Sequence, residues 1–484
     1  MKKDNKIIGE KVYDFVFRYY KIILISLTVI VLSIPLIKNY LNYNVLIMGG
    51  ESYYHLLNKP VNLITNFLPD SIIYFIPLVL AIATIALLFT LAKKLNISKK
   101  FIFLFILFLI FTPAFIYTFS TISAYAFYTF FVVSGFALLL QRKKIKPLSI
   151  IPFIFATLFD LFSTILMVSM LFFYFKIKEK SNRNFKLTLF FLIGISILIN
   201  SLIFKQPFII GPFHLQQLLS DLISDFGGRS GTGFFLLLLG FIGTTLTWKR
   251  KEFYVSYLIL LICIPAYLIN TQIIFPLSVV IIFFATFAFI EIFQRKWILN
   301  DLKKFTLLIL ILGILFSSIS YLDRISEIGP SNDDIKVLEW INRETLSESI
   351  VFSEPENSYY IKYFANREPF YFPHEKNEVR GNNYENPNSN TNADNNDNPN
   401  SNTNNKVNNK VNKNNKANVT DSIFNSLYIR ELFPILEQNR ISIIYITPKM
   451  KTKLSSDQGL LFLLKNERFK MVYTHEEYEV WMFE

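Results

Sequence analysis

Eleven apolar runs fill the first two thirds of this 484-residue chain, and they limit its possible folds more than any other feature. A helix crosses a bilayer core about 30 Å thick with roughly 20 apolar residues. Shorter helices are tolerated at membrane depth where protein surrounds them. The pattern therefore predicts a polytopic α-helical membrane protein with about eleven transmembrane helices. The runs are residues 22–37, 71–92, 101–119, 122–140, 148–159, 161–175, 187–204, 233–247, 254–270, 272–293 and 305–321.

The segments between these runs place nearly all of their positive charge on one side. Up to Tyr321 the chain carries 30 Lys and Arg, of which 26 lie in the N-terminal arm and every second junction and 4 in the other junctions. Basic segments of multi-pass proteins stay in the cytoplasm. The asymmetry predicts a cell-membrane protein with a cytoplasmic arm at residues 1–21, a transmembrane domain at 22–321 and an extracytoplasmic C-terminal domain.

One stretch, residues 147–175, is 29 residues long and has basic segments on both flanks. That length is long for one span and short for two. A single span would place Lys176, Lys178 and Lys180 outside and would invert every later helix. Two short helices that turn near Asp160 keep the charge rule, so we expect two helices here.

The charge distribution argues against nucleic-acid binding, although the net charge is +13. Up to Tyr321, 30 basic and 12 acidic residues give +18, whereas 19 basic and 24 acidic residues from Leu322 onward give −5. The positive charge lies beside the membrane, where it orients helices and meets anionic lipid. The single cysteine, Cys263, lies in an apolar run; it excludes a disulfide framework, and we expect it to be a small buried residue.

Beyond Tyr321, alternating helix and strand patterns predict a small α/β domain with a largely parallel sheet. This domain comprises residues 322–376 and 420–484. Between them, the Asn-rich insert at 377–419 cannot bury a core, and we expect it to be disordered. The expected helices are 334–344, 359–364, 427–439 and 459–466, and the expected strands are 349–352, 442–447, 471–474 and 480–483.

Two segments on the predicted outer side are long, and we call residues 38–70 the first long loop and residues 205–232 the second long loop. The first contains the sequence GGESYYH at residues 49–55, which places a carboxylate, Glu51, beside Tyr54 and His55. Such a cluster suits a metal ion, a lipid phosphate or a sugar hydroxyl. The alternative is an interfacial aromatic belt with a solvated acid.

The second long loop holds the other polar cluster, which includes His214. Its stretch 215–226 has the spacing of an amphipathic helix on the membrane surface. Asp221 and Asp225 are four residues apart, so a helix would place both carboxylates on one face. Arg229 lies among glycines, and its guanidinium suits bidentate phosphate recognition; the alternative is a glycine hinge with a solvated arginine. Asp160, between the two short helices, suits either substrate binding or helix capping.

These features together resemble membrane glycosyltransferases of the GT-C class, and among them archaeal oligosaccharyltransferase catalytic subunits. The resemblance rests on an N-in first helix, a long first loop with an acid beside Tyr-Tyr-His, and paired short helices. The sequence DFGGRSG at residues 225–231, which runs into an apolar helix ending in Thr247-Trp248-Lys249, is similar to a loop-to-helix passage of that family. Residues 334–367 are similar to the start of its outer soluble domain.

The resemblance implies that a sugar carried on a polyprenyl phosphate or diphosphate is transferred at the outer face. The implied partners are membrane lipid and this lipid-linked donor. Glu51 would act as the base or bind metal, and Arg229 would face the phosphate. A divalent cation, Mg²⁺ or Mn²⁺, would be held by Glu51, Asp221 or Asp225. The expected substrate-binding residues are Tyr54, His55, Asp160, His214 and Arg229.

Two departures from the family pattern change the expected reaction. The turn at residues 119–122 has no acid, and the WWDYG signature is replaced by EPENSYY at 354–360. That signature builds the acceptor pocket for protein Asn-glycosylation, so single-sugar transfer from a lipid monophosphate fits better. Two alternatives remain: a non-catalytic membrane scaffold that displays the outer domain, and a transporter, which the lack of intramembrane basic residues and paired halves disfavours.

Overall fold

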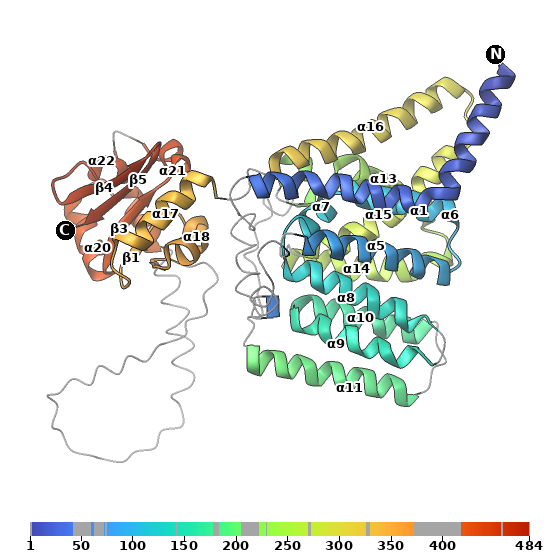
Figure 1. The fold of residues 1–484 in the computed structure, drawn as a ribbon, viewed down its shortest axis with the longest axis horizontal. Helices are drawn as coiled ribbons and strands as arrows, with labels where there is room; N and C mark the ends of the chain where they lie inside the picture. The colour runs from blue at the N-terminus through green and yellow to red at the C-terminus, as the bar shows by residue number, and fades with distance from the viewer. Residues whose placement is uncertain are drawn as a thin grey trace. The chain divides into compact units, whose positions relative to one another are not determined.

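The computed structural model describes residues 2–41, 60–61, 72, 75–141, 144–159, 161–177, 183–204, 222–228, 230–269, 273–325, 330–371, 418–455 and 458–483. The chain divides into two compact units, Met1–Gly329 and Pro330–Glu484 (Figure 1).

The first unit is a multi-pass bundle of apolar helices, and every one of the eleven runs is helical. Within the part of the chain that the structure describes, six helices are long and apolar enough to cross a membrane, and the bent pair α6–α7 qualifies as a seventh span. Shorter apolar helices make up the other four runs. The helices are α1 (Lys2–Leu41), α5 (Ile76–Lys94), α6 (Lys99–Ile110), α7 (Pro113–Ser120), α8 (Ala124–Leu139), α9 (Ile150–Phe159), α10 (Leu161–Ile177), α11 (Arg183–Ile199), α13 (Phe234–Thr247), α14 (Tyr254–Ile269), α15 (Ile274–Gln294) and α16 (Asn300–Arg324).

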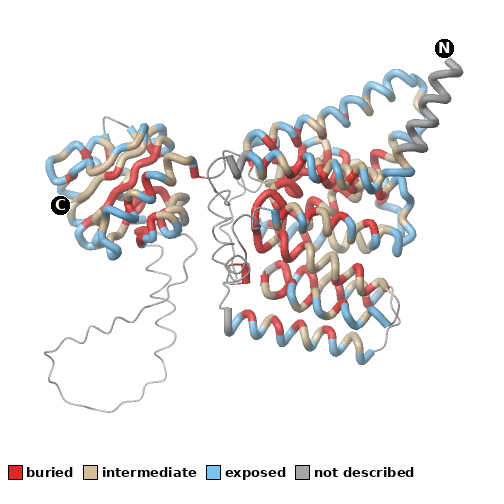
Figure 2. The backbone as a smooth tube through the Cα atoms, viewed as in Figure 1, coloured by how far each residue is buried: buried red, intermediate tan, exposed pale blue. Residues whose placement is uncertain are grey.

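The helices pack in a row in which α11 lies on α9, α9 on α8, α8 on α5 and α5 on α1 (Figure 1). One buried cluster lies between α1, α5, α6, α7, α13, α15 and α16, and a second between α8, α9, α10 and α11 (Figure 2). Faces that point away from these clusters carry large exposed apolar side chains, among them Phe191, Phe241 and Phe316. Apolar faces of this kind suit contact with lipid rather than with water.

The structure corrects one prediction about the helices and confirms another. The first helix begins at Lys2, so the residues predicted as an N-terminal arm continue the helix. The stretch 147–175 forms two helices, α9 and α10, which separate between Phe159 and Leu161 as predicted.

The sequence analysis treated residues 101–119 as one run, but they do not form one straight helix. It bends by 64° between α6 and α7. Pro113 is the first residue of α7, and Thr112 before it has extended backbone angles (φ −82°, ψ 130°). Proline lacks an N–H and disfavours helical geometry in the preceding residue, so the helix must break here. After the break, α7 is buried along nearly its whole length.

Helices α13 and α15 approach closely because α13 presents glycines to its neighbour. A Cβ at Gly240 would lie 2.7 Å from Cγ2 of Ile281, and one at Gly243 would overlap the carbonyl oxygen of Phe284. Small residues at such positions let membrane helices pack backbone against backbone.

The second unit has a five-stranded sheet of order β2-β1-β3-β5-β4 with helices on both faces. Its helices are α17 (Asn332–Glu344), α18 (Ser358–Tyr360), α20 (Ile429–Gln438), α21 (Pro448–Lys453) and α22 (Leu460–Leu463), and its strands are β1 (Ile350–Phe352), β2 (Glu368–Pro369), β3 (Ile441–Ile446), β4 (Phe469–His475) and β5 (Tyr478–Phe483). On β3, Ile444 and Ile446 belong to the cluster with α20, while Ile443 and Tyr445 belong to the cluster with α17.

The prediction of a largely parallel sheet is wrong in its second half. Strands β2, β1 and β3 are parallel, but β5 is antiparallel to both β3 and β4. Only Glu476 and Glu477 separate β4 from β5, and strands joined by two residues must form an antiparallel hairpin. Glu476 has a positive φ of 53°, which such a tight turn requires.

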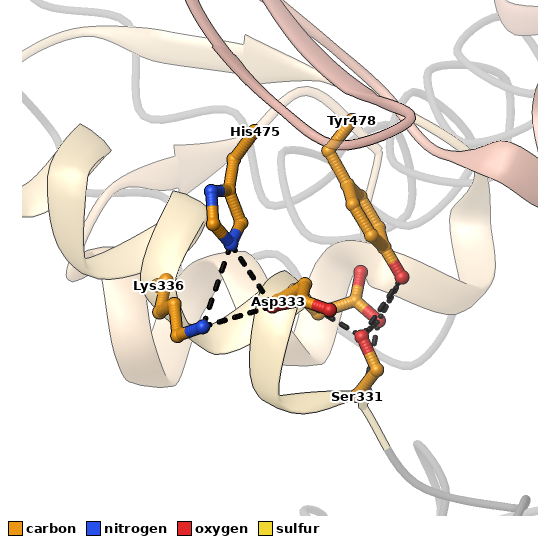
Figure 3. A network of polar contacts seen from close by, with 6 residues as sticks. Ser331, Asp333, Lys336, His475 and Tyr478 are labelled. Atoms are coloured by element: carbon orange, nitrogen blue, oxygen red, sulfur yellow. Dashed lines mark hydrogen bonds and ion pairs between the residues drawn. The ribbon is translucent and has the colours of Figure 1, made fainter.

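A polar network joins the start of α17 to this hairpin (Figure 3). Ser331 and Asp334 form a capping box at the first turn of α17. The Asp334 carboxylate also accepts hydrogen bonds from the hydroxyls of Tyr445 (2.5 Å) and Tyr478 (3.0 Å). Burial, and then the charge of Asp334, raises the pKa of Tyr445, so this phenol remains a neutral donor.

The second half of the network centres on Asp333. Its carboxylate lies 3.0 Å from the Lys336 ammonium and 2.9 Å from Nε2 of His475 (Figure 3). Hydrogen bonds from Lys336 and then His475 lower the pKa of Asp333. The carboxylate therefore holds the helix start against the end of β4.

We expect Gly243→Ala to lower the thermal unfolding midpoint of the purified protein, because the added methyl group would push α13 away from α15. Overpacking of this kind costs about 1–3 kcal/mol. The matched control is Gly194→Ala on α11, where an added Cβ would meet nothing within 4 Å. Equal midpoints for the two variants would show that the close α13–α15 contact does not stabilise the bundle.

We expect Asp333→Asn to reduce amide hydrogen-exchange protection in α17 and β4, after correction for intrinsic exchange rates. Because folding lowers the pKa of Asp333, its stabilising effect is complete above the unfolded value of about 3.9 and is lost as pH falls through the folded value. The difference from wild type should therefore shrink below about pH 4. A difference that persists undiminished in acid would contradict this assignment. Glu339→Gln, in a mostly exposed pair with Arg343, is the control and should have little effect.

Candidate functional site

Seven of the eight predicted site residues lie outside the described part of the chain. The structure does describe the eighth, Asp225, and the points at which both long loops attach to the bundle. The seven are Glu51, Tyr54, His55, Asp160, His214, Asp221 and Arg229.

The first long loop attaches to the bundle at Pro60 and Val61. Val61 is fully buried and belongs to the cluster that includes Ile122, Ala124 and Phe127. These three residues lie in the turn after α7 and in the first part of α8. The loop that carries Glu51 is therefore anchored beside the α7–α8 turn.

The end of the second long loop closes on itself. The Thr232 amide donates to the carbonyl of Leu222 at 2.9 Å, and Ile223 pairs with Thr232 in an isolated bridge. Gly227 and Gly231 have φ values of 93° and 144°, which are strained for residues with a side chain. In the sequence, Arg229 lies between these two glycines of the closed loop.

Asp225 ties the closed loop to two helices. One carboxylate oxygen accepts the Phe234 amide at 2.7 Å, at the first turn of α13, and the other accepts the Ser317 hydroxyl of α16 at 2.5 Å. Asp225 thus acts as an N-terminal cap, because the first amides of a helix have no partner within it. Its role as a metal ligand remains a prediction, and within the described residues no three His, Cys, Asp or Glu side chains cluster as a metal site would require.

Both long loops meet the same short helix. The Ala114 amide, in the first turn of α7, donates to the carbonyl of Gly231 at 2.8 Å. Beyond the other end of α7, Ile122 belongs to the same buried cluster as Val61 of the first long loop. Helix α7 therefore lies between the attachment points of the two loops that carry Glu51 and Arg229.

The α7–α8 turn itself is neutral. Its polar side chains are hydroxyls, and each is buried. Three of them donate to carbonyls of α7: Thr118 to Ala114 at 2.7 Å, Ser120 to Tyr117 at 3.2 Å and Ser123 to Thr118 at 3.3 Å. Hydroxyl and aromatic side chains, without an acid, therefore lie between the attachment points of the two long loops. The buried hydroxyls are Thr118, Ser120, Thr121 and Ser123.

Arg324 is a residue at this site that the sequence analysis missed. Helix α16 continues past Tyr321 to Arg324, whose guanidinium donates to the Ser224 carbonyl at 2.5 Å and lies 5.9 Å from the Tyr321 ring centroid. The sequence could have predicted this longer helix, because Leu322 and Ile325 continue the apolar helical spacing after Tyr321. Both residues are buried. A second arginine therefore stands at the base of the closed loop.

The segment EPENSYY at residues 354–360, which the sequence analysis expects in place of WWDYG, follows β1 in the second unit. Glu354 is mostly buried and forms an ion pair with Lys453 of α21 at 2.8 Å. Next to it, Asn357 donates to the Ser353 hydroxyl at 3.0 Å, and this hydroxyl contacts the Met450 sulfur at 3.6 Å. The cluster lies at the carboxyl ends of parallel strands β1 and β3, the usual place for ligands on such sheets. Here the carboxylate is already neutralised by a lysine of the same chain.

No protein-family model matches the chain, and no curated protein has a similar sequence. Solved structures do match. The oligosaccharyltransferase of Archaeoglobus fulgidus in its apo form superposes with a TM-score of 0.53 and 13% identity over 96% of this chain and 74% of that one. The same enzyme tethered to an acceptor peptide with an NVT sequon gives a TM-score of 0.52 and 11% identity over 97% and 75%.

At such low identity, these matches show the fold alone. They extend over nearly the whole chain and include both the helical bundle and the mixed-sheet unit. The chain therefore has a fold similar to that of the archaeal oligosaccharyltransferase, as the resemblance of its sequence predicted.

Proposed function

We propose that this chain is an integral membrane glycosyltransferase that transfers a sugar from a polyprenyl-phosphate-linked donor at the outer membrane face. The main support is the attachment of both long loops at the two ends of α7. In this proposal all eleven apolar helices cross or enter the membrane with the N-terminus inside. Glu51 and Arg229 then border one site on the outer side.

The reaction needs a base and a partner for phosphate charge. The acceptor hydroxyl oxygen attacks the anomeric carbon of the sugar while the bond from that carbon to the donor phosphate breaks. Glu51 takes the hydroxyl proton, and the phosphate leaves with the bonding electron pair. Arg229 and Arg324 stabilise the negative charge that develops on the phosphate. Tyr54, His55, Asp160 and His214 are proposed to contact the sugar or the lipid phosphate.

A divalent cation fits the carboxylates of this site, since Mg²⁺ and Mn²⁺ prefer oxygen ligands. Glu51 and Asp221 would hold it, and it would neutralise phosphate charge. Both carboxylate oxygens of Asp225 already accept hydrogen bonds, from the Phe234 amide and the Ser317 hydroxyl. We therefore assign Asp225 first to positioning the closed loop.

The second unit supports a small acceptor rather than a protein acceptor. In the segment expected in place of WWDYG, the Glu354 carboxylate forms an ion pair with Lys453. Transfer of a single sugar from a lipid monophosphate does not need an acceptor-sequon pocket there. The identity of the sugar is a separate question that lipid analysis of the purified protein would answer.

One observation favours a second function, that of a non-catalytic scaffold which displays the second unit. The α7–α8 turn carries hydroxyls and no acid, so one carboxylate of the related enzymes has no counterpart there. A scaffold would not bind lipid-linked sugars. Mass spectrometry of lipids that copurify with the protein therefore separates the two functions.

We expect Glu51→Gln to lower the rate of sugar transfer by about 100-fold or more, because a positioned base contributes about 10²–10⁴. The assay would follow transfer from purified polyprenyl-phosphate sugars in proteoliposomes. Glu252→Gln is the control. Glu252 is an exposed acid on the side that the charge distribution assigns to the cytoplasm, so this variant should transfer sugar at the wild-type rate. Full activity of Glu51→Gln would remove the proposed base.

A further inference from the structure

Asn418, Val419 and Thr420 form an N-x-T sequence that the proposed function does not use. This pattern is the acceptor sequence for N-linked glycans, although three such residues also occur together by chance. It lies at the end of the predicted Asn-rich insert, and no earlier asparagine of the insert begins another N-x-S or N-x-T sequence. Whether the pattern is a real acceptor depends on where the fold places its first and third residues.

The structure places Asn418 in the first turn of a helix at residues 418–425 of the second unit. One face of this helix is buried: Ile423 belongs to the cluster with α20, and Thr420 is 3% exposed. Asn418 and Ser422, one turn apart, are exposed on the opposite face. The Ser422 hydroxyl donates to the backbone carbonyl of Asn418 at 2.8 Å, and this bond does not use the side-chain amide. A bulky, solvated sugar on this side chain is therefore compatible with the folded unit.

Thr420 determines when such a sugar can be added. Because the motif includes its third residue, the transferring enzyme must recognise the Thr420 hydroxyl as well as the asparagine. In the folded unit this threonine is buried and belongs to the helix. The enzyme can therefore read the motif only while residues 418–420 are unwound and outside the core of the second unit.

A second sequence of this type, Asn96-Ile97-Ser98, provides an internal comparison. It lies between α5 and α6, in a junction that the charge distribution assigns to the cytoplasm. Asn96 and Ser98 are both exposed in the folded bundle. If exposure alone decided modification, Asn96 would be the better acceptor. The two sequences therefore separate the effect of exposure from the effect of the side of the membrane.

We propose that Asn418 carries an N-linked glycan, added on the outer side by a separate oligosaccharyltransferase before the second unit folds. The donor is a lipid-linked oligosaccharide. The side-chain nitrogen of Asn418 bonds to the anomeric carbon of the sugar, while the bond from that carbon to the donor phosphate breaks. The phosphate leaves with the electron pair, and one amide proton passes to a base of the transferring enzyme. This inference rests on the proposed orientation of the chain and not on sugar transfer by the chain itself.

Peptide mass spectrometry of the full-length protein, purified from its native membranes, tests the site. The peptide that contains Asn418 should carry a glycan, and the peptide that contains Asn96 should not. Asn418→Gln should remove the modification, whereas Thr420→Ser keeps the hydroxyl and should retain it. The matched control, Asn96→Gln, should leave the glycan on Asn418 unchanged.

The two ways in which this test can fail have different consequences. If neither asparagine carries a glycan, the proposed modification is wrong, and the proposed sugar transfer by this chain is unaffected. A glycan on Asn96 and none on Asn418 would overturn the modification and also the orientation on which the proposed function depends.

A pulse–chase experiment tests the timing. Cells are depleted of the lipid-linked donor while the chain is synthesised and labelled, and the donor is restored after synthesis has stopped. Chains that folded without the donor should stay unmodified at Asn418, because Thr420 is then buried. Chains made after restoration should carry the glycan. Equal modification of both sets would show that burial of Thr420 does not control the addition.

Discussion

The break at Pro113 is the constraint on which the arrangement of the predicted site depends. Because proline cannot donate a hydrogen bond, α6 ends at Ile110, Thr112 is extended, and α7 starts again at an angle of 64°. A new helix start leaves its first amides without partners inside the helix. One of them, the Ala114 amide, donates to Gly231 of the second long loop. The bend thus creates the group that fixes the loop carrying Arg229.

The same principle fixes the other end of that loop. The first amides of α13 also need partners, and the carboxylate of Asp225 supplies one for Phe234 while it binds Ser317 of α16. Two helix starts, α7 and α13, therefore hold a glycine-rich loop at both sides, and Arg324 holds its base through Ser224. Holding a loop at both sides in this way restricts its backbone, and a restricted loop suits recognition of a phosphate.

Local patterns in the sequence were enough to predict the helices, whereas contacts between distant residues were not predicted. The α9–α10 break followed from charge and length, and the eleven runs all proved helical. The bend at Pro113 was visible in the sequence but was read as part of one run. The pairing of β5 with β3 and the ion pair of Glu354 with Lys453 join residues far apart in the chain, and no periodicity predicts them. Glu51 and six other predicted site residues lie outside the described structure and stay predictions.

The central claim is that the two long loops converge on the outer side of the membrane. The most direct test places cysteines beside the two key residues, as Ser52→Cys with Ser230→Cys, and treats intact cells with a membrane-impermeant bis-maleimide. The single native cysteine, Cys263, is buried and does not compete. We expect an intramolecular cross-link in this pair and none in Ser52→Cys with Ser181→Cys. Two results would contradict convergence of the loops on the outer side. In one, both cysteines are labelled in intact cells but are not cross-linked; in the other, they are labelled only after permeabilisation.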